Sequence, residues 1–156
     1  MKNIIVLLVG VLTVLNGFSC ATNNSAQENL IPQDELNALF NNVYDKYQSD
    51  VILDGAQSYV VVKGDTMTKI SAKYYGSGYE YLFPMIMVSS RDVIVDPSLI
   101  EPGMNLTIPD LAKNLVPKNR MQIAYILTGF ADIYSKKGDS RTYDRFMRLA
   151  MKLAAY

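Results

Sequence analysis

The sequence of 156 residues contains no histidine, no tryptophan and a single cysteine, Cys20. The lack of histidine excludes a Ser-His-Asp triad and a Cys-His dyad, and a lone cysteine excludes an intrachain disulfide and a Cys-X-X-Cys zinc site. The 15 basic and 15 acidic residues balance to zero net charge, which does not favour a nucleic-acid partner held by a basic face. We therefore expect no metal, no cofactor and no nucleic acid.

The N-terminal residues have the pattern of an export signal. Lys2 precedes an apolar run of twelve residues, Ile4–Leu15, which is too short to span a membrane because a span needs about 20 residues. Residues 1–19 are therefore interpreted as a signal peptide. A small residue before a lone Cys20 resembles the bacterial lipobox, although Gly17 stands where leucine is usual. The resemblance implies a lipidated Cys20 that anchors the mature protein to a bilayer; an ordinary secretory peptide with an incidental cysteine is the alternative.

The first part of the mature chain combines a tether with one helix. Residues 20–31 are small and polar and are interpreted as a flexible tether. Within 32–57, apolar residues recur at the helical spacing i, i+3, i+4, i+7, i+8, i+11: Leu36, Leu39, Phe40, Val43, Tyr44 and Tyr47. We expect an amphipathic helix that docks on its own chain, followed by a connector in which Val51, Ile52 and Leu53 pack against apolar surface.

The rest of the chain is organised around residues 58–110. A β-branched run, Val60–Val62, precedes a Gly-Asp-Thr elbow at 64–66 and a helical pattern. A second apolar helical segment follows, then two proline-containing turns and a short strand, Leu106–Ile108. The order is therefore strand, helix, helix, strand.

Residues 59–109 resemble the LysM module, a β-α-α-β fold that binds peptidoglycan and chitin. The opening YVVVKGDTMTKIS, the loop IVDPSLI and the ending PGMNLTIP are similar to successive motifs of the family. Ser89-Ser90 and Phe83 depart from it, since Ala-Asn and Trp are common at these places. The implied fold class is α+β: a two-stranded antiparallel sheet with two helices, to which the chain adds three flanking amphipathic helices.

The resemblance implies a shallow glycan groove between two loops. The positions that match the family's two binding loops imply ten glycan-binding residues: Gly64, Asp65, Thr66, Met67, Ile94, Val95, Asp96, Pro97, Leu99 and Ile100. Asp65 and Thr66 equally suit a structural role as caps of the following helix. We expect Asp96→Ala to lower binding and leave the fold intact. The tyrosines of the module fit core or rim positions better than sugar-stacking ones.

Residues 111–156 predict a short linker, 111–118, and a helical hairpin. Two apolar stripes carry the prediction: Ile123, Ile126, Leu127, Phe130, Ala131 and Tyr134, then Tyr143, Phe146, Met147, Ala150, Leu153 and Ala154. Gly138 stands where a left-handed helix cap is wanted, and Asp139 or Ser140 can cap the second helix. The hairpin resembles one tetratricopeptide-type unit, although Tyr143 stands where a small residue is usual. The alternative is that it forms a small bundle with the first helix or flanks the LysM core.

The sequence as a whole predicts a secreted, non-enzymatic lipoprotein of the cell envelope, at the periplasmic face or in the outer membrane. It would bind N-acetylglucosamine-containing glycan, peptidoglycan, through one LysM module and tether membrane to wall. The short helices outside the module leave too few residues for a carboxylate-based catalytic cleft. In the alternative, the LysM fold is a scaffold and the terminal helices bind a protein partner or a second copy. An exposed apolar face on those helices would favour the alternative, and a buried one would weaken it.

Overall fold

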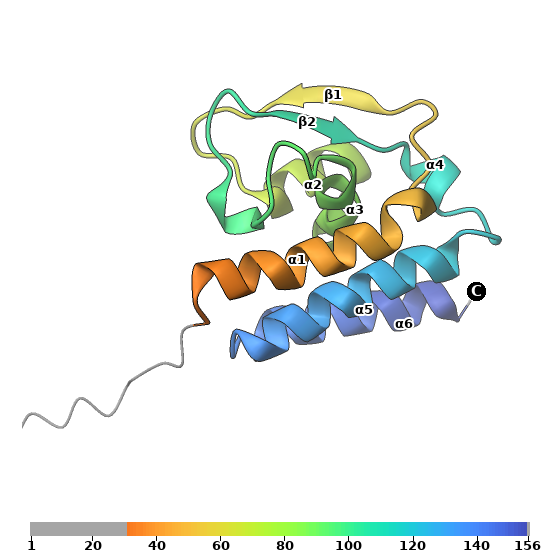
Figure 1. Cartoon of the computed structure of the whole chain (residues 1–156). Coiled ribbons are helices and arrows are strands. Elements are labelled where there is room, and N and C mark those ends of the chain that lie inside the picture. Colours follow the sequence, from red (N-terminus) through yellow and green to blue (C-terminus); the bar gives the residue numbers. More distant parts are fainter. Residues whose placement is uncertain (1–30, 156) are drawn as a thin grey trace, which may run out of the picture.

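The computed structural model describes residues 31–155. The predicted signal peptide (1–19), Cys20 and residues 20–30 of the predicted tether lie outside this range. Three 3-10 turns, Gln48–Asp50, Glu80–Leu82 and Pro97–Leu99, link the main elements. In chain order these elements are α1 (Gln33–Tyr47), β1 (Gln57–Val60), α2 (Met67–Tyr75), α3 (Phe83–Ser89), β2 (Asn105–Ile108), α4 (Leu111–Asn114), α5 (Arg120–Lys136) and α6 (Ser140–Ala154) (Figure 1).

The predicted α+β fold is confirmed. β1 and β2 form a two-stranded antiparallel sheet in which Tyr59 lies opposite Leu106. The sheet covers α2 and α3, and α1, α5 and α6 run side by side beneath these two helices (Figure 1). The first strand lies earlier than the predicted Val60–Val62, because Gln57 pairs with Ile108 across the sheet. Pairing with the partner strand, rather than β-branched content, decides its bounds.

The helices outside the module share one core with it, and aromatic rings form the centre of that core. The ring of Phe130 in α5 lies 5.5 Å from Phe40 of α1 and 6.2 Å from Phe83 of α3. Phe83 in turn lies 5.4 Å from Phe146 of α6. All four side chains are buried. Phe83, where tryptophan is common in the family, therefore joins the module to the hairpin.

The hairpin forms as predicted and turns its apolar face inward. Gly138 ends α5 with a φ of 75°, which a glycine adopts without steric cost. Asp139 caps α6 by accepting a hydrogen bond from the Thr142 N–H at 3.0 Å. Phe146, Leu149, Ala150 and Leu153 of α6 are buried. Tyr143, the departure from the tetratricopeptide pattern, is half-buried and packs on the same core. The hairpin therefore packs both on the first helix, through Phe40 and Phe130, and on the LysM core, through Phe83.

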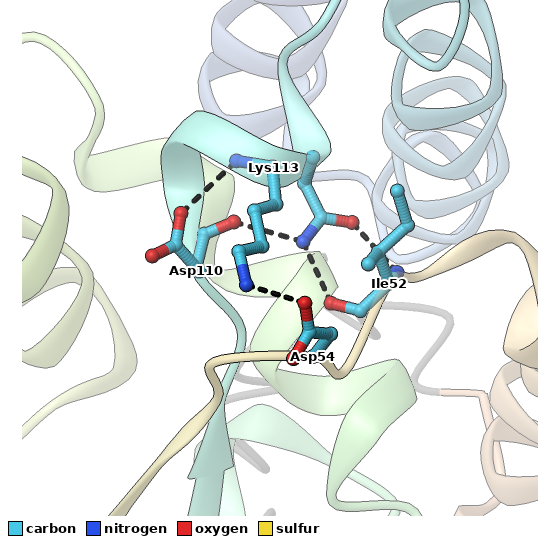
Figure 2. A network of polar contacts seen from close by, with 5 residues as sticks. Ile52, Asp54, Asp110 and Lys113 are labelled. Carbon is cyan, nitrogen blue, oxygen red and sulfur yellow. Dashed lines mark hydrogen bonds and ion pairs between the residues drawn. The ribbon is translucent and has the colours of Figure 1, made fainter.

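The predicted linker 111–118 contains a short helix, α4, that the sequence did not indicate. Buried Asn114 accepts a hydrogen bond from the Ile52 N–H at 2.8 Å and donates one to the Ile52 carbonyl at 2.9 Å. Lys113 contacts Asp54 at 2.5 Å in the same network (Figure 2). These bonds attach the connector after α1 to the segment after β2. Leu53, expected to pack on apolar surface, is instead 52% exposed.

Candidate functional site

A groove of about 310 Å³ lies between the elbow before α2 and the loop before β2. The elbow and α2 contribute Asp65, Thr66, Met67 and Thr68. The opposite loop contributes Pro97, Ser98 and Ile100. The remaining lining residues come from the turn before α3, from the start of α3 and from the hairpin: Tyr81, Phe83, Tyr134 and Thr142. The two loops that the resemblance implied therefore face each other across one groove.

The elbow wall is held by its own side chains. Asp65 Oδ2 accepts hydrogen bonds from the Val62 N–H at 2.9 Å and the Tyr59 hydroxyl at 2.7 Å. These two bonds hold the pKa of Asp65 below its usual range. Thr66 Oγ1 accepts from the Lys69 N–H at 3.2 Å and caps α2. Thr66 is therefore the predicted cap of α2. Asp65 does not cap the helix and instead fixes the elbow through Val62 and Tyr59. Both residues also line the groove.

The opposite wall is built around a buried carboxylate. The Asp96 side chain is 1% exposed. Its Oδ1 accepts hydrogen bonds from the Ser98 N–H at 2.8 Å and the Ser98 hydroxyl at 2.5 Å, and its Oδ2 accepts one from Gln33 of α1 at 3.3 Å. Burial favours the protonated form, but the bonds from Ser98 and Gln33 together outweigh it and hold the pKa of Asp96 below its usual range. Asp96 therefore orders the loop from within.

The ten residues implied by the resemblance occupy three kinds of place. Five line the groove: Asp65, Thr66, Met67, Pro97 and Ile100. Two have interior side chains, 4% exposed for Ile94 and 1% for Asp96. The other three, Gly64, Val95 and Leu99, lie in the same two loops outside the groove lining. The Asp96 side chain is buried and accepts three hydrogen bonds, so it supports the wall from inside. Asp96→Ala is therefore expected to destabilise the loop, contrary to the expectation that it leaves the fold intact.

The hairpin closes one side of the groove with residues that sequence reasoning missed. Tyr134 of α5 is half-buried, with its ring 5.5 Å from Phe146. Burial, with Asp96 and Asp139 nearby, raises the pKa of the Tyr134 hydroxyl, so it stays protonated at neutral pH and can both donate and accept a hydrogen bond. Thr142 of α6 adds a second hydroxyl. No pattern in the sequence signals either residue, because only the packing of the hairpin on the module brings them here.

The groove offers hydroxyls, one carboxylate, aromatic rings and apolar side chains. Such a lining suits a neutral polar ligand, with hydrogen bonds to hydroxyl and amide groups and apolar cover for methyl groups and ring faces. No cluster of carboxylate or thiol side chains within residues 31–155 is arranged to hold a metal ion. In the same range, no helix has the length and apolar character that crossing a bilayer requires.

Comparison with protein families matches residues 59–82 to the LysM domain. No curated protein and no solved structure matches the chain. LysM domains are binding modules rather than catalytic ones, and they bind N-acetylglucosamine-containing glycans such as peptidoglycan. The match covers the elbow, α2 and the turn before α3, and the structure adds α3 and β2. The chain therefore carries a LysM domain, identified at residues 59–82 and folded as a complete β-α-α-β unit.

Proposed function

We propose that this protein is a non-enzymatic binder of peptidoglycan that holds N-acetylglucosamine-containing glycan in the groove between its two LysM loops. One observation carries the proposal: the Asp65–Thr68 wall and the Pro97–Ile100 wall line the same groove. Hydroxyl groups of Thr66, Thr68 and Ser98 can bond N-acetyl amides and sugar hydroxyls. Ile100 can cover an N-acetyl methyl group.

A single groove of this kind binds weakly. Its lining has few ordered polar anchors, and a shallow contact leaves little surplus over the entropy cost of association. Residues 31–155 contain one LysM module, identified at 59–82, and we expect avidity to come from many copies held against a polymeric ligand. We therefore expect binding to strengthen with glycan length.

We further propose that the protein is exported and anchored through an acylated Cys20 in the cell envelope, where it tethers membrane to wall. The apolar leader and the lone cysteine at its end support this proposal. Metabolic labelling with a fatty acid tests it. Label in the parent and none in Cys20→Ser supports the anchor, and an unlabelled parent overturns it.

The alternative, a scaffold whose helices bind a protein partner, receives less support. It depended on an exposed apolar face of the hairpin. Phe130 of α5 and Phe146 of α6 are instead 0% exposed, and both contact Phe83 of the module. The buried apolar face of the hairpin is occupied by the LysM domain and by α1.

Sedimentation with purified insoluble peptidoglycan tests the groove. The protein is residues 21–156, which contain all the described structure. Ile100→Ala removes apolar cover from the groove wall, and Leu99→Ala is the matched control, because Leu99 is 51% exposed and outside the lining. We expect the parent and Leu99→Ala to sediment equally and Ile100→Ala to sediment less, with thermal unfolding measured for all three.

Each outcome has a distinct reading. If the parent does not sediment, peptidoglycan binding is wrong. If all three sediment equally, the protein binds the wall by another surface. If Leu99→Ala sediments less and Ile100→Ala sediments like the parent, the glycan lies outside the groove lining and the proposed site is wrong.

A further inference from the structure

The exposed side of α6 carries a strip of positive charge. Its members follow the spacing i, i+4, i+7, i+11, which places them on one line along the helix, and all are exposed: Arg141, Arg145, Arg148 and Lys152. The ion pairs within residues 31–155 are Arg91–Asp45 and Lys113–Asp54, so none of the four belongs to one. Arg148 donates one hydrogen bond, from Nε to the Asp144 carbonyl at 3.3 Å, and Lys152 Nζ lies over the Tyr79 ring. The positive charge of the strip is therefore not neutralised by a carboxylate, and an anion from outside can pair with it.

Part of this strip lines a second hollow, of about 230 Å³, between α6 and the turn after α2. Three cations face it, Arg145, Arg148 and Lys152, together with one carboxylate, Glu80. Glu80 is already engaged: its two oxygens accept from the Gly78 N–H at 3.0 and 3.1 Å. This bond, with Arg145 nearby, holds the pKa of Glu80 below its usual range, so it stays ionised. The hollow keeps an excess of positive charge.

The hollow adjoins the glycan groove. Tyr81 lines both of them. On α6, Thr142 of the groove and Arg145 of the hollow stand at i and i+3, which makes them neighbours on the helix surface. The rise from Thr142 to Lys152 is about 15 Å, since a helix advances 1.5 Å per residue. A chain-like ligand that leaves the groove past Tyr81 therefore runs along the positive strip.

We propose that this strip is an extension of the groove that selects glycan carrying free carboxylates over neutral glycan. The inference rests on the proposed function and names the ligand class within it: a polysaccharide whose sugars bear acidic substituents, as peptidoglycan strands do through their lactyl-linked peptides and chitin does not. Arginine forks bind carboxylates with two parallel hydrogen bonds, which are stronger than neutral ones. A neutral glycan leaves Arg145 and Arg148 solvated and gains nothing from them.

Two variants and two ligands test this selection. Arg145→Gln/Arg148→Gln removes two charges from the hollow, and Lys46→Gln/Lys118→Gln removes two from surfaces that line neither the groove nor the hollow. The ligands are a neutral N-acetylglucosamine tetramer and a peptidoglycan tetrasaccharide with free peptide carboxylates. Residues 21–156 are titrated with each ligand by NMR at low and moderate salt.

We expect the parent and the control to bind the acidic ligand more tightly, with a preference that salt weakens. In Arg145→Gln/Arg148→Gln we expect the ratio of the two affinities, acidic over neutral, to fall about threefold to tenfold, because exposed charge-assisted contacts are lost. Binding of the neutral tetramer should be unchanged.

The failures are distinguishable. If both ligands bind but the hollow variant keeps the full preference, the inference is wrong and the proposed function stands. If the control loses the preference equally, non-specific charge explains it and the inference is wrong. If neither ligand binds the parent, the proposed function fails as well. If the parent binds both ligands equally tightly, there is no preference for the acidic glycan and the inference is wrong.

Discussion

The hydroxyl of Tyr44, in the last turn of α1, donates a hydrogen bond to the backbone carbonyl of Val95, in the loop that forms one wall of the groove. A helix outside the LysM domain thereby holds part of its binding loop. Gln33, at the start of α1, reaches the same loop through Asp96. The first helix therefore supports one wall of the groove.

Tyr44→Phe should cost about 1 kcal/mol of unfolding free energy, the usual worth of a buried hydrogen bond whose acceptor is left without its partner. It should also lower peptidoglycan binding, because the wall that contains Val95 becomes less ordered. Urea unfolding and sedimentation measure the two effects. Tyr125→Phe, at a ring that is 52% exposed, is the control and should change neither. Unchanged stability of Tyr44→Phe would show that the bond is not formed in solution.

Asp96 should make the protein sensitive to acid. Its folded-state pKa lies below the ordinary value of about 3.9 because hydrogen bonds from Ser98 and Gln33 outweigh its burial. A group with a lowered folded pKa contributes stability above its unfolded pKa and loses it as pH falls through the folded pKa. We expect the stability difference between the parent and Asp96→Asn, measured by urea unfolding, to be largest at neutral pH and to shrink below about pH 4.

Because the Asp96 carboxylate stabilises the loop, Asp96→Ala is unsuitable as a test of direct glycan contact. Asp96→Ala is expected to cost about 2 kcal/mol at neutral pH, the range for hydrogen bonds to a charged acceptor. A loss of glycan binding in that variant would therefore report a damaged wall and not a lost contact. If the difference in unfolding free energy between the parent and Asp96→Asn stays constant from pH 7 to pH 3, the lowered pKa of Asp96 is wrong.

The elbow should show a high-pH titration. The hydrogen bond to Asp65, then partial desolvation, raises the pKa of Tyr59 to about 12. Because the folded pKa is raised, the stabilisation from this bond is present below the ordinary value of about 10 and lost as pH rises through about 12. NMR titration of the Tyr59 ring should show this value in the parent and a lower one in Asp65→Ala. Titration of Tyr59 at its ordinary pKa in the parent would exclude the bond.

The LysM module should not be self-sufficient. Residues 58–110 expressed alone would expose the Phe83 side chain, which is 3% exposed in the full chain, and would lack Tyr134 and Thr142 of the groove. Exposure of one such ring costs about 1.5–3 kcal/mol. We expect this fragment to be largely unfolded by circular dichroism and NMR, while residues 21–156 unfold in a single transition. A folded fragment with full peptidoglycan binding would show that the predicted boundaries 58–110 define an independent domain.

Local patterns predicted most of the fold. The strand-helix-helix-strand order, the Thr66 cap and the Gly138–Asp139 turn are each set by a few neighbouring residues, so the sequence alone reveals them. Helix α4 was missed, because four residues are too few to show a helical period. The first strand was misplaced for a related reason: Gln57 has little strand preference of its own and is a strand residue only because Ile108 lies opposite.

For the candidate site, too, the sequence identified short local motifs but not the contacts made between distant segments. The elbow and the loop before β2 were identified from the sequence, since both consist of short motifs with fixed spacing. The buried position of Asp96 depends in part on Gln33 of α1, which lies 63 residues earlier in the chain. A motif specifies residue types and their order, but burial of a loop side chain depends on what packs against the loop.

The sequence by itself determined the strand-helix-helix-strand order and three amphipathic helices, because periodicity and turn chemistry are encoded within a few residues of each other. The resemblance of its motifs to the LysM family implied the two loops of a groove. Only the tertiary structure decided that the hairpin completes the groove through Tyr134 and Thr142, and that the positive strip of α6 continues from it past Tyr81. The physical reason is that an amphipathic stripe specifies which face of a helix is buried, whereas its partner surface is chosen by the packing of all the helices around one aromatic core.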